Sequence, residues 1–299
     1  MKYLAKETEN LVLNKKYKTK DSVKKMMKRV ITALVGFPIV DAVLAVANKY
    51  VVDVIVTIVA LIAMNEYIKC VAHKDVHVIK WISYLSVLGI AFIHLIPVTL
   101  YLKMIVFAIP ILLLILFLHV IVTNMRITFQ DVAYTFIGIA YVYSFLVFLA
   151  IIFGMDGIVS GKWLIWYVFC SAWGTDIMAY LVGMKFGKHK FSKVSPKKSI
   201  EGCVAGVTGA LVLCLLYTLV LNNTLGCEIS YLAVAIMSIV LSIIGQIGDF
   251  SASVIKRYFD VKDYSNLFPG HGGMLDRIDS AMFIAPFAYL FMVLVMMVV

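Results

Sequence analysis

Long apolar runs dominate this chain and limit what it can fold into. A run of about 18 or more apolar residues can cross the ~30 Å hydrocarbon core of a bilayer as a helix. Of the 299 residues, 63% are hydrophobic and 15% are charged, and the mean hydropathy is +0.97; soluble domains are roughly 45–50% apolar and 25% charged. We therefore predict an all-α integral membrane protein with about nine transmembrane helices, at residues 30–48, 50–68, 78–98, 104–123, 132–154, 163–184, 203–221, 229–248 and 280–299.

The positions of lysine and arginine predict how these helices are oriented. If the N-terminus is cytoplasmic, the cytoplasmic segments hold 24 of the 27 basic residues, and the other side keeps only Lys49, Lys103 and Lys162. Positive loops are retained on the cytoplasmic side, so we predict a cytoplasmic N-terminus and an outer C-terminus. The cytoplasmic segments are then 1–29, 69–80, 124–131, 185–201 and 249–279.

The charge pattern also divides the chain into three parts. A basic cytoplasmic segment (1–29) precedes about five spans (30–155), and a second membrane half (156–299) holds about four spans and the cytoplasmic loops 185–201 and 249–279. The net charge of +10 is mainly a topology signal, although the first segment also suits anionic head groups. Nucleic acid is not an expected partner.

Several common kinds of site are missing from the sequence. The five cysteines are scattered and form no C-x-x-C pair, which argues against a disulfide framework and a zinc site. No Walker A, G-x-G-x-x-G or H-E-x-x-H motif occurs, nor a hydrolase nucleophile elbow. The candidate chemistry instead lies in charged residues between about 170 and 280.

Asp176 is the clearest charge inside a predicted span. An ionisable group in hydrocarbon costs at least ~2.5–3.5 kcal/mol on insertion scales. Asp176 lies nine residues before Lys185, which is about 13 Å along a helix. Trp173, Tyr180 and Gly183 share its helix face by their 3/4 spacing. Two interpretations stay open: Asp176 lines a membrane-embedded cavity, or a buried Asp–Tyr hydrogen bond pins two helices.

The loop after this span is rich in lysine. Solvated positive charge explains much of it, but the segment SPKKS (195–199) combines a stiff Pro196 with two hydroxyls and two ammonium groups. That chemistry suits polyphosphate, and it makes Lys197 and Lys198 candidates for binding it.

Segment 249–280 carries the densest pattern. If the eighth helix continues past the membrane face, Asp249, Ser253, Lys256 and Arg257 fall on one side of it. A carboxylate followed by two cations can hold a metal ion and the phosphates bound to it. The glycines of PGHGG (269–273) let backbone N–H groups converge on an anion.

Asp276 and Asp279 lie three residues apart at the start of the last span. Helix capping explains one acid there, but it does not explain two acids, an arginine and a glycine-rich loop together. Oxygen ligands without thiolates, beside many cations, favour Mg²⁺ and phosphoryl or nucleotidyl chemistry at the cytoplasmic surface.

At these residues the chain resembles the phosphatidate cytidylyltransferase (CDP-diacylglycerol synthase) family. That family's C-terminal signature is matched with every spacing kept by Ser253, Lys256, Arg257, Lys262, Asp263, Pro269, His271, Gly272, Gly273, Asp276, Arg277 and Asp279. An upstream pattern is matched by Asp176, Ala179, Tyr180, Gly183, residues 186–188 and residues 195–202. The resemblance covers about residues 170–280. Ala252 and Ser265 stand where many members have glutamate and glycine.

The resemblance implies a reaction and roles. CTP and phosphatidate would give CDP-diacylglycerol and pyrophosphate, with Mg²⁺ and a second metal ion as cofactors. It implies Asp249 and Asp276 as metal ligands, with Lys256, Arg257 and Arg277 as catalytic phosphate-binding groups. Substrate-binding candidates are Asp176, Tyr180, Lys197, Lys198, Ser253, Lys262, Asp263, His271, Gly272, Gly273 and Asp279.

The sequence also leaves alternative functions open and indicates the partners and the location of the protein. A related CTP-dependent lipid enzyme, such as a CDP-archaeol synthase or a polyprenol kinase, would use the same chemistry, and a transporter using Asp176 is a remote alternative. The expected partners are CTP, phosphatidate and membrane lipids, and homodimer formation stays open. The expected location is a bacterial cytoplasmic membrane with the site facing the cytoplasm.

Overall fold

The computed structural model describes residues 41–157, 159–192, 195, 198–268, 270 and 272–296. These residues form helices and loops, and within them the only β-type pairing is two isolated bridges, Lys190 with Ser199 and Phe268 with Gly272. The all-α expectation is confirmed for this part of the chain. The predicted basic segment 1–29 and most of the predicted first span lie outside the described residues.

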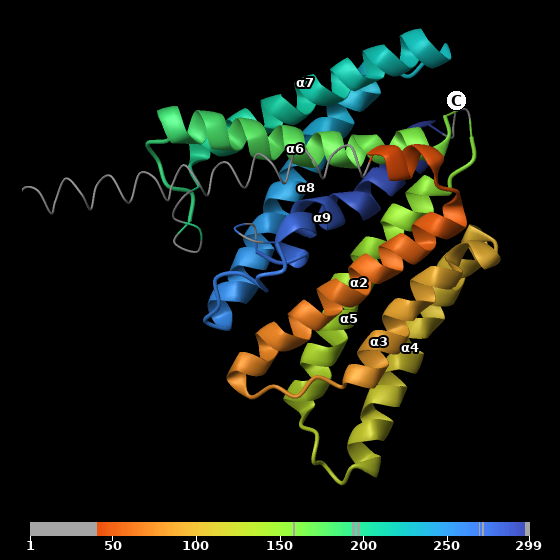
Figure 1. Ribbon diagram of the computed structural model, residues 1–299, viewed down its shortest axis with the longest axis vertical. Helices are drawn as coiled ribbons and strands as arrows, with labels where there is room; N and C mark the ends of the chain where they lie inside the picture. The colour runs from red at the N-terminus through yellow and green to blue at the C-terminus, as the bar shows by residue number, and fades with distance from the viewer. Residues whose placement is uncertain are drawn as a thin grey trace, which may run out of the picture.

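The helices form two groups that are visible in Figure 1. The first group holds α2 (Lys49–Val71), α3 (Lys80–Leu88), α4 (Val98–Val122) and α5 (Phe129–Phe153); the second holds α6 (Gly161–Phe186), α7 (Ile200–Leu225), α8 (Tyr231–Tyr258) and α9 (Leu275–Phe291). Short elements η1 (Ala72–Lys74) and η2 (Gly89–Leu95) are 3₁₀ helices, and η3 (Met292–Met296) is a π-helical turn. Helix α9 packs on both groups, because it contacts α8 and α6 as well as α5 and α2.

Seven helices of the described residues are long and apolar enough to cross a membrane: α2, α4, α5, α6, α7, α8 and α9. The predicted span 78–98 is instead a shorter apolar helix, Lys80–Leu95, which turns from α-helix into 3₁₀ helix at Gly89. This tighter segment is tied to α2, because Nδ1 of His94 contacts both carboxylate oxygens of the buried Asp53 at 2.7 and 2.9 Å. The count of nine spans therefore stays a prediction.

Aromatic contacts join the two groups, and glycines bring helices close together within the second group. Phe283 of α9 stacks on Phe145 of α5 with ring centroids 4.4 Å apart, and it meets the edge of Tyr141 at 6.0 Å. Within the second group, α6 and α7 lie close together because Gly174 faces Gly209, where a Cβ on Gly174 would lie 2.8 Å from the Gly209 carbonyl oxygen. Small residues allow such close approach of membrane helices.

Candidate active site

The carboxylate of Asp276 joins the end of α8 to the start of α9. Its Oδ1 accepts a hydrogen bond from Nζ of Lys256 at 2.5 Å, and its Oδ2 accepts the backbone N–H groups of Tyr264 at 2.8 Å and Gly273 at 2.9 Å. Both charged side chains are buried, so each needs its partner, and removing one partner of such a pair typically costs about 3–5 kcal/mol.

Tyr264 lies beside this pair. Its ring centroid is 5.3 Å from Nζ of Lys256. Burial, together with the neighbouring Tyr141, raises the pKa of the Tyr264 phenol above its ordinary range. The phenol is therefore neutral, and it adds no negative charge to the site.

A second ion pair anchors the loop between α6 and α7 on α8. Nζ of Lys198 pairs with Oδ2 of Asp249, and both side chains remain about a quarter exposed, at 27% and 25%. Lys198 also lies 4.2 Å from the ring centroid of Phe250, which stacks on Phe191. The lysine-rich loop predicted to bind polyphosphate is thus held beside the carboxylate predicted to bind metal.

Two further acids, Asp176 of α6 and Asp279 of α9, lie near the charged groups of α8, α9 and the α6–α7 loop. Asp176 of α6 is exposed, and Asp279 of α9 is buried, with Oδ1 accepting the N–H of Ser280 at 2.8 Å. Asp249 lies near both acids, Lys198 and Arg277 lie near Asp176, and Lys256 lies near Asp279. The Tyr180 side chain is 65% exposed, which argues against a buried Asp–Tyr hydrogen bond that pins two helices.

Glycine is needed at the two positions before α9, Gly272 and Gly273, for different structural reasons. Gly272 has φ +82°, a conformation that favours glycine, and a Cβ there would lie 2.7 Å from Oδ2 of Asp276. Gly273 leaves room for another acid, because its Cβ would lie 2.5 Å from Oε1 of Glu66. In this structure the N–H of Gly273 bonds to Asp276.

Other predicted site residues are not drawn into the site by hydrogen bonds or ion pairs within the described part of the chain. Arg257 is exposed and donates from Nη1 to the Val261 carbonyl at 3.0 Å. Tyr180, Lys262 and Asp263 are also exposed, and Ser253 is partly buried. Lys197 and His271 lie outside the described residues.

Glu66 is the residue to which the sequence assigned no role. It lies on α2, it is 3% exposed, and its carboxylate reaches the residues just before and within the first turn of α9. A lone acid within an apolar run was the available signal, but its partners lie 199 to 209 residues away in the chain.

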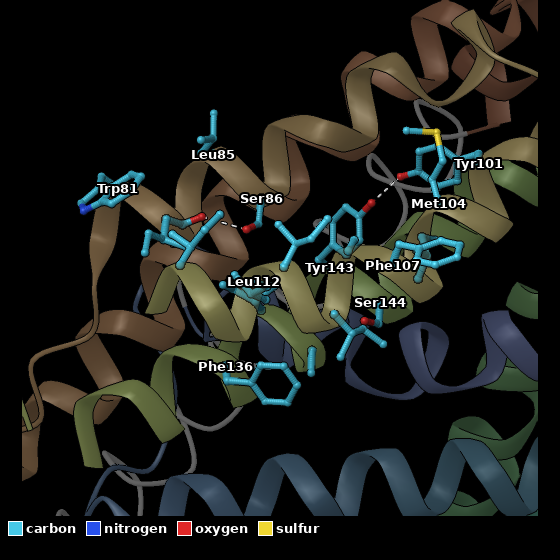
Figure 2. Close-up of a pocket in the computed structure, with 18 of the residues that line it drawn as sticks. Trp81, Leu85, Ser86, Tyr101, Met104, Phe107, Leu112, Phe136, Tyr143 and Ser144 are labelled. Carbon is cyan, nitrogen blue, oxygen red and sulfur yellow. Dashed lines mark hydrogen bonds between the residues drawn. The ribbon is translucent and has the colours of Figure 1, made fainter. Parts of the chain in front are cut away.

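Two of the cavities formed by the described residues can be compared with the site. The first, of about 580 Å³, is lined mainly by apolar residues of α3, α4 and α5, and Figure 2 shows the Tyr101 and Tyr143 hydroxyls pointing toward each other at its edge. None of the predicted site residues lines it. The second, of about 520 Å³, lies between α7 and α8 and includes Phe250 and Gln246, so it borders the Lys198–Asp249 pair.

The donor set of the site fits a magnesium ion. Mg²⁺ prefers hard oxygen ligands, and it takes one or two carboxylates while waters and phosphates complete its shell. Asp276 supplies such oxygens in the first turn of α9, and Asp249 supplies them nine residues before the end of α8. Among the residues described, no three His, Cys, Asp or Glu side chains are grouped as a metal cage.

The site combines acids, lysines and a glycine-rich segment before α9. Such a combination beside membrane helices is typical of an enzyme that handles phosphate groups at a membrane surface. The chain belongs to the cytidylyltransferase family, whose family model matches residues 27–295.

Three similar curated proteins share the name phosphatidate cytidylyltransferase. The phosphatidate cytidylyltransferase of Bacillus subtilis (strain 168) is 35% identical over 182 residues, which are 60% of this chain and 65% of that protein. The protein of the same name from Thermotoga maritima is 38% identical over 164 residues, 54% of this chain and 59% of the relative. That from Staphylococcus saprophyticus is 37% identical over 173 residues, 58% and 63% respectively. The matches thus span about three fifths of the relatives' length.

Proposed function

We propose that the protein is a phosphatidate cytidylyltransferase, which converts CTP and phosphatidate into CDP-diacylglycerol and pyrophosphate. The observation that carries the proposal is that two ion pairs, Lys198–Asp249 and Lys256–Asp276, bring together acids and cations of the α6–α7 loop, α8 and the start of α9. The position of these pairs suits a reaction between a lipid and a water-soluble nucleotide. The names of the relatives support the choice of substrates.

The reaction needs no covalent bond to the protein. A phosphate oxygen of phosphatidate forms a bond to the α-phosphorus of CTP, the bond from that phosphorus to the bridging oxygen breaks, and pyrophosphate leaves. The chain's own residues position the two phosphate groups and offset their negative charge. Lys198, Lys256, Arg257 and Arg277 bind phosphates in this proposal.

The remaining assignments follow the sequence signature. Asp249 and Asp276 would hold Mg²⁺, which when bound supplies charge neutralisation at the transferring phosphoryl group. Asp176 orients groups in the membrane-embedded part of the site. Further contacts to the substrates come from Tyr180, Lys197, Ser253, Lys262, Asp263, His271, Gly272, Gly273 and Asp279.

The proposed location of the site in the membrane rests on the uneven distribution of lysine and arginine between the two sides. With the N-terminus inside and nine spans, both site loops, 185–201 and 249–279, face the cytoplasm, where CTP is available. The supporting observation is that these loops and the other segments assigned to that side carry 24 of 27 basic residues. A bacterial cytoplasmic membrane is the proposed location.

An assay of the purified chain in detergent tests the function. With CTP labelled at the α-phosphate, phosphatidate and Mg²⁺, we expect label in the lipid fraction and one pyrophosphate per lipid product. Transfer of the γ-phosphate with release of CDP would identify a lipid kinase instead. Activity with archaeol phosphate but not with phosphatidate would point to a CDP-archaeol synthase, and ion flux in liposomes without turnover would point to a transporter.

A further inference from the structure

Glu66 of α2 accepts hydrogen bonds with both carboxylate oxygens from residues next to the candidate active site. Its Oε1 accepts the hydroxyl of Ser265 at 2.6 Å and the N–H of Met274 at 2.9 Å. Its Oε2 accepts the N–H of Leu275 at 2.8 Å. A helix of the first group therefore holds the connection between α8 and α9.

The charge of Glu66 is balanced by backbone dipoles. The ion pairs found within the described ranges do not include Glu66. It faces the N-terminus of α9, where unpaired N–H groups and the helix dipole favour a carboxylate. The N-cap residue of α9, Met274, makes no side-chain cap of its own. Glu66 supplies that cap from another helix.

Glu66 and Asp276 accept hydrogen bonds from neighbouring residues of the same segment, 264–275. Before the helix, Tyr264 donates to Asp276 and its neighbour Ser265 donates to Glu66. At the helix start, Gly273 donates to Asp276 and its neighbour Met274 donates to Glu66. The position of Asp276 beside Lys256 therefore depends on the hydrogen bonds of Glu66 as well as on those of Asp276 itself.

The attachment point of Glu66 is itself fixed. The neighbouring Tyr67 is 1% exposed, and its hydroxyl donates to the Tyr134 carbonyl of α5 at 3.0 Å. Its ring occupies the space where Gly138 has no side chain. Helix α2 is thereby locked onto α5 at the level of Glu66, so Glu66 can transmit a fixed position to α9.

We propose that Glu66 is a positioning residue for the reaction: by capping α9 from α2, it holds the first turn of α9 so that Asp276 meets Lys256 and the substrates. This inference rests on the proposed function for its kinetic consequence, although its structural consequence can be measured separately. It also gives the first group of helices a role in the chemistry.

The test compares Glu66→Gln with a matched control, Asp131→Asn. Asp131 of α5 is also 3% exposed, and its carboxylate accepts the backbone N–H groups of His77 at 2.6 Å and Thr128 at 2.8 Å. The hydrogen bonds that its carboxylate accepts among the described residues come from His77 and Thr128, neither of which is assigned to the site. Both variants remove a buried carboxylate bound to backbone N–H groups, so a general loss of stability should affect both alike.

Two readouts are measured on the full chain in detergent. Hydrogen–deuterium exchange of peptides covering 264–276 should rise in Glu66→Gln, because the glutamine NH₂ group is a donor and cannot accept the backbone N–H of Leu275 as Oε2 of Glu66 does. Exchange of the same peptides should stay at the wild-type level in Asp131→Asn. In the CTP and phosphatidate assay, kcat of Glu66→Gln should fall about tenfold to a hundredfold, the scale expected for a small misplacement of catalytic groups. The KM values should change less than about threefold, since Glu66 touches no substrate.

The outcomes separate the two proposals. Wild-type exchange and wild-type kcat in Glu66→Gln would overturn the positioning role, and so would equal losses of kcat in Glu66→Gln and Asp131→Asn. A wild-type chain that forms no CDP-diacylglycerol would overturn the proposed function, while the exchange measurement still decides on Glu66. If Glu66→Gln does not fold, Ser265→Ala provides a second variant, because it removes one hydrogen-bond donor to Oε1 of Glu66. Hydrogen–deuterium exchange near residue 265 should then rise, and kcat should fall about threefold, on the scale of one lost hydrogen bond. No change in either measurement would overturn the positioning role.

Discussion

At the scale of single residues, Asp276 offers the sharpest test of the candidate site. Asparagine at 276 keeps the shape but removes the charge that Lys256 pairs with and that a metal ion would need. We expect Asp276→Asn to lower CDP-diacylglycerol formation by at least about a hundredfold or to demand far more Mg²⁺, a loss comparable to removing a key electrostatic group. Asp279→Asn should be milder, since the hydrogen bond of Asp279 goes to the N–H of its neighbour Ser280.

Initial rates over a series of Mg²⁺ concentrations check this prediction, with expression and thermal unfolding as controls for folding. A wild-type rate and wild-type Mg²⁺ dependence in Asp276→Asn would show that the metal assignment is wrong. Asp176 or Asp279 would then be the next candidate.

Gly273 gives a second test at this scale. The sequence predicted that Gly272 or Gly273 needs flexible backbone, and the structure separates the two: Gly272 has a positive φ, whereas Gly273 gives space to Glu66. Gly273→Val should therefore push Glu66 aside and lower the reaction rate about tenfold or more, while membrane insertion stays normal. Gly157→Ala, where a Cβ meets no atom within 4 Å, should have the wild-type rate. A fully active Gly273→Val would mean that the segment is a plain turn.

At the scale of helices, the close contact between α6 and α7 rests on Gly174 and Gly209. A Cβ on Gly209 would overlap the Gly174 carbonyl oxygen, which is backbone and cannot move aside alone. We expect Gly209→Ala to force the helices apart and to lower stability by about 1–3 kcal/mol, as overpacking does. Tryptophan fluorescence during heating measures the unfolding temperature, and the Gly157→Ala variant again serves as the control. An unchanged unfolding temperature in Gly209→Ala would contradict this account of the packing.

The helices themselves were largely predictable, whereas their contacts were not. The predicted span 203–221 lies within α7, and α8 continues to Tyr258 as the charge spacing required. The two acids at the start of α9 were also found, because acids within three residues of each other beside glycines form a local pattern. The change to 3₁₀ helix at Gly89 and the contact of His94 with Asp53 of another helix were both missed. The contacts of Glu66 with Ser265, Met274 and Leu275 were missed because hydrogen bonds between distant segments leave no periodicity in the sequence.

At the scale of the whole molecule, the site can work only if both of its loops face the side that holds CTP. The prediction of a cytoplasmic N-terminus and an outer C-terminus rests on the basic residues, 24 of 27 of which then lie inside, and on an odd number of spans. A reporter that is active only outside the cytoplasm should therefore work when fused after Val299 and fail when fused after Lys188. Lys188 belongs to the loop that carries Lys198 to Asp249, so its side is the side of the site. The same fusions to a reporter active only in the cytoplasm provide the control, and they should give the opposite pattern. Activity of the outer reporter at Lys188 would place the ion-pair cluster on the face without CTP, and the proposed reaction could not then occur in the cell.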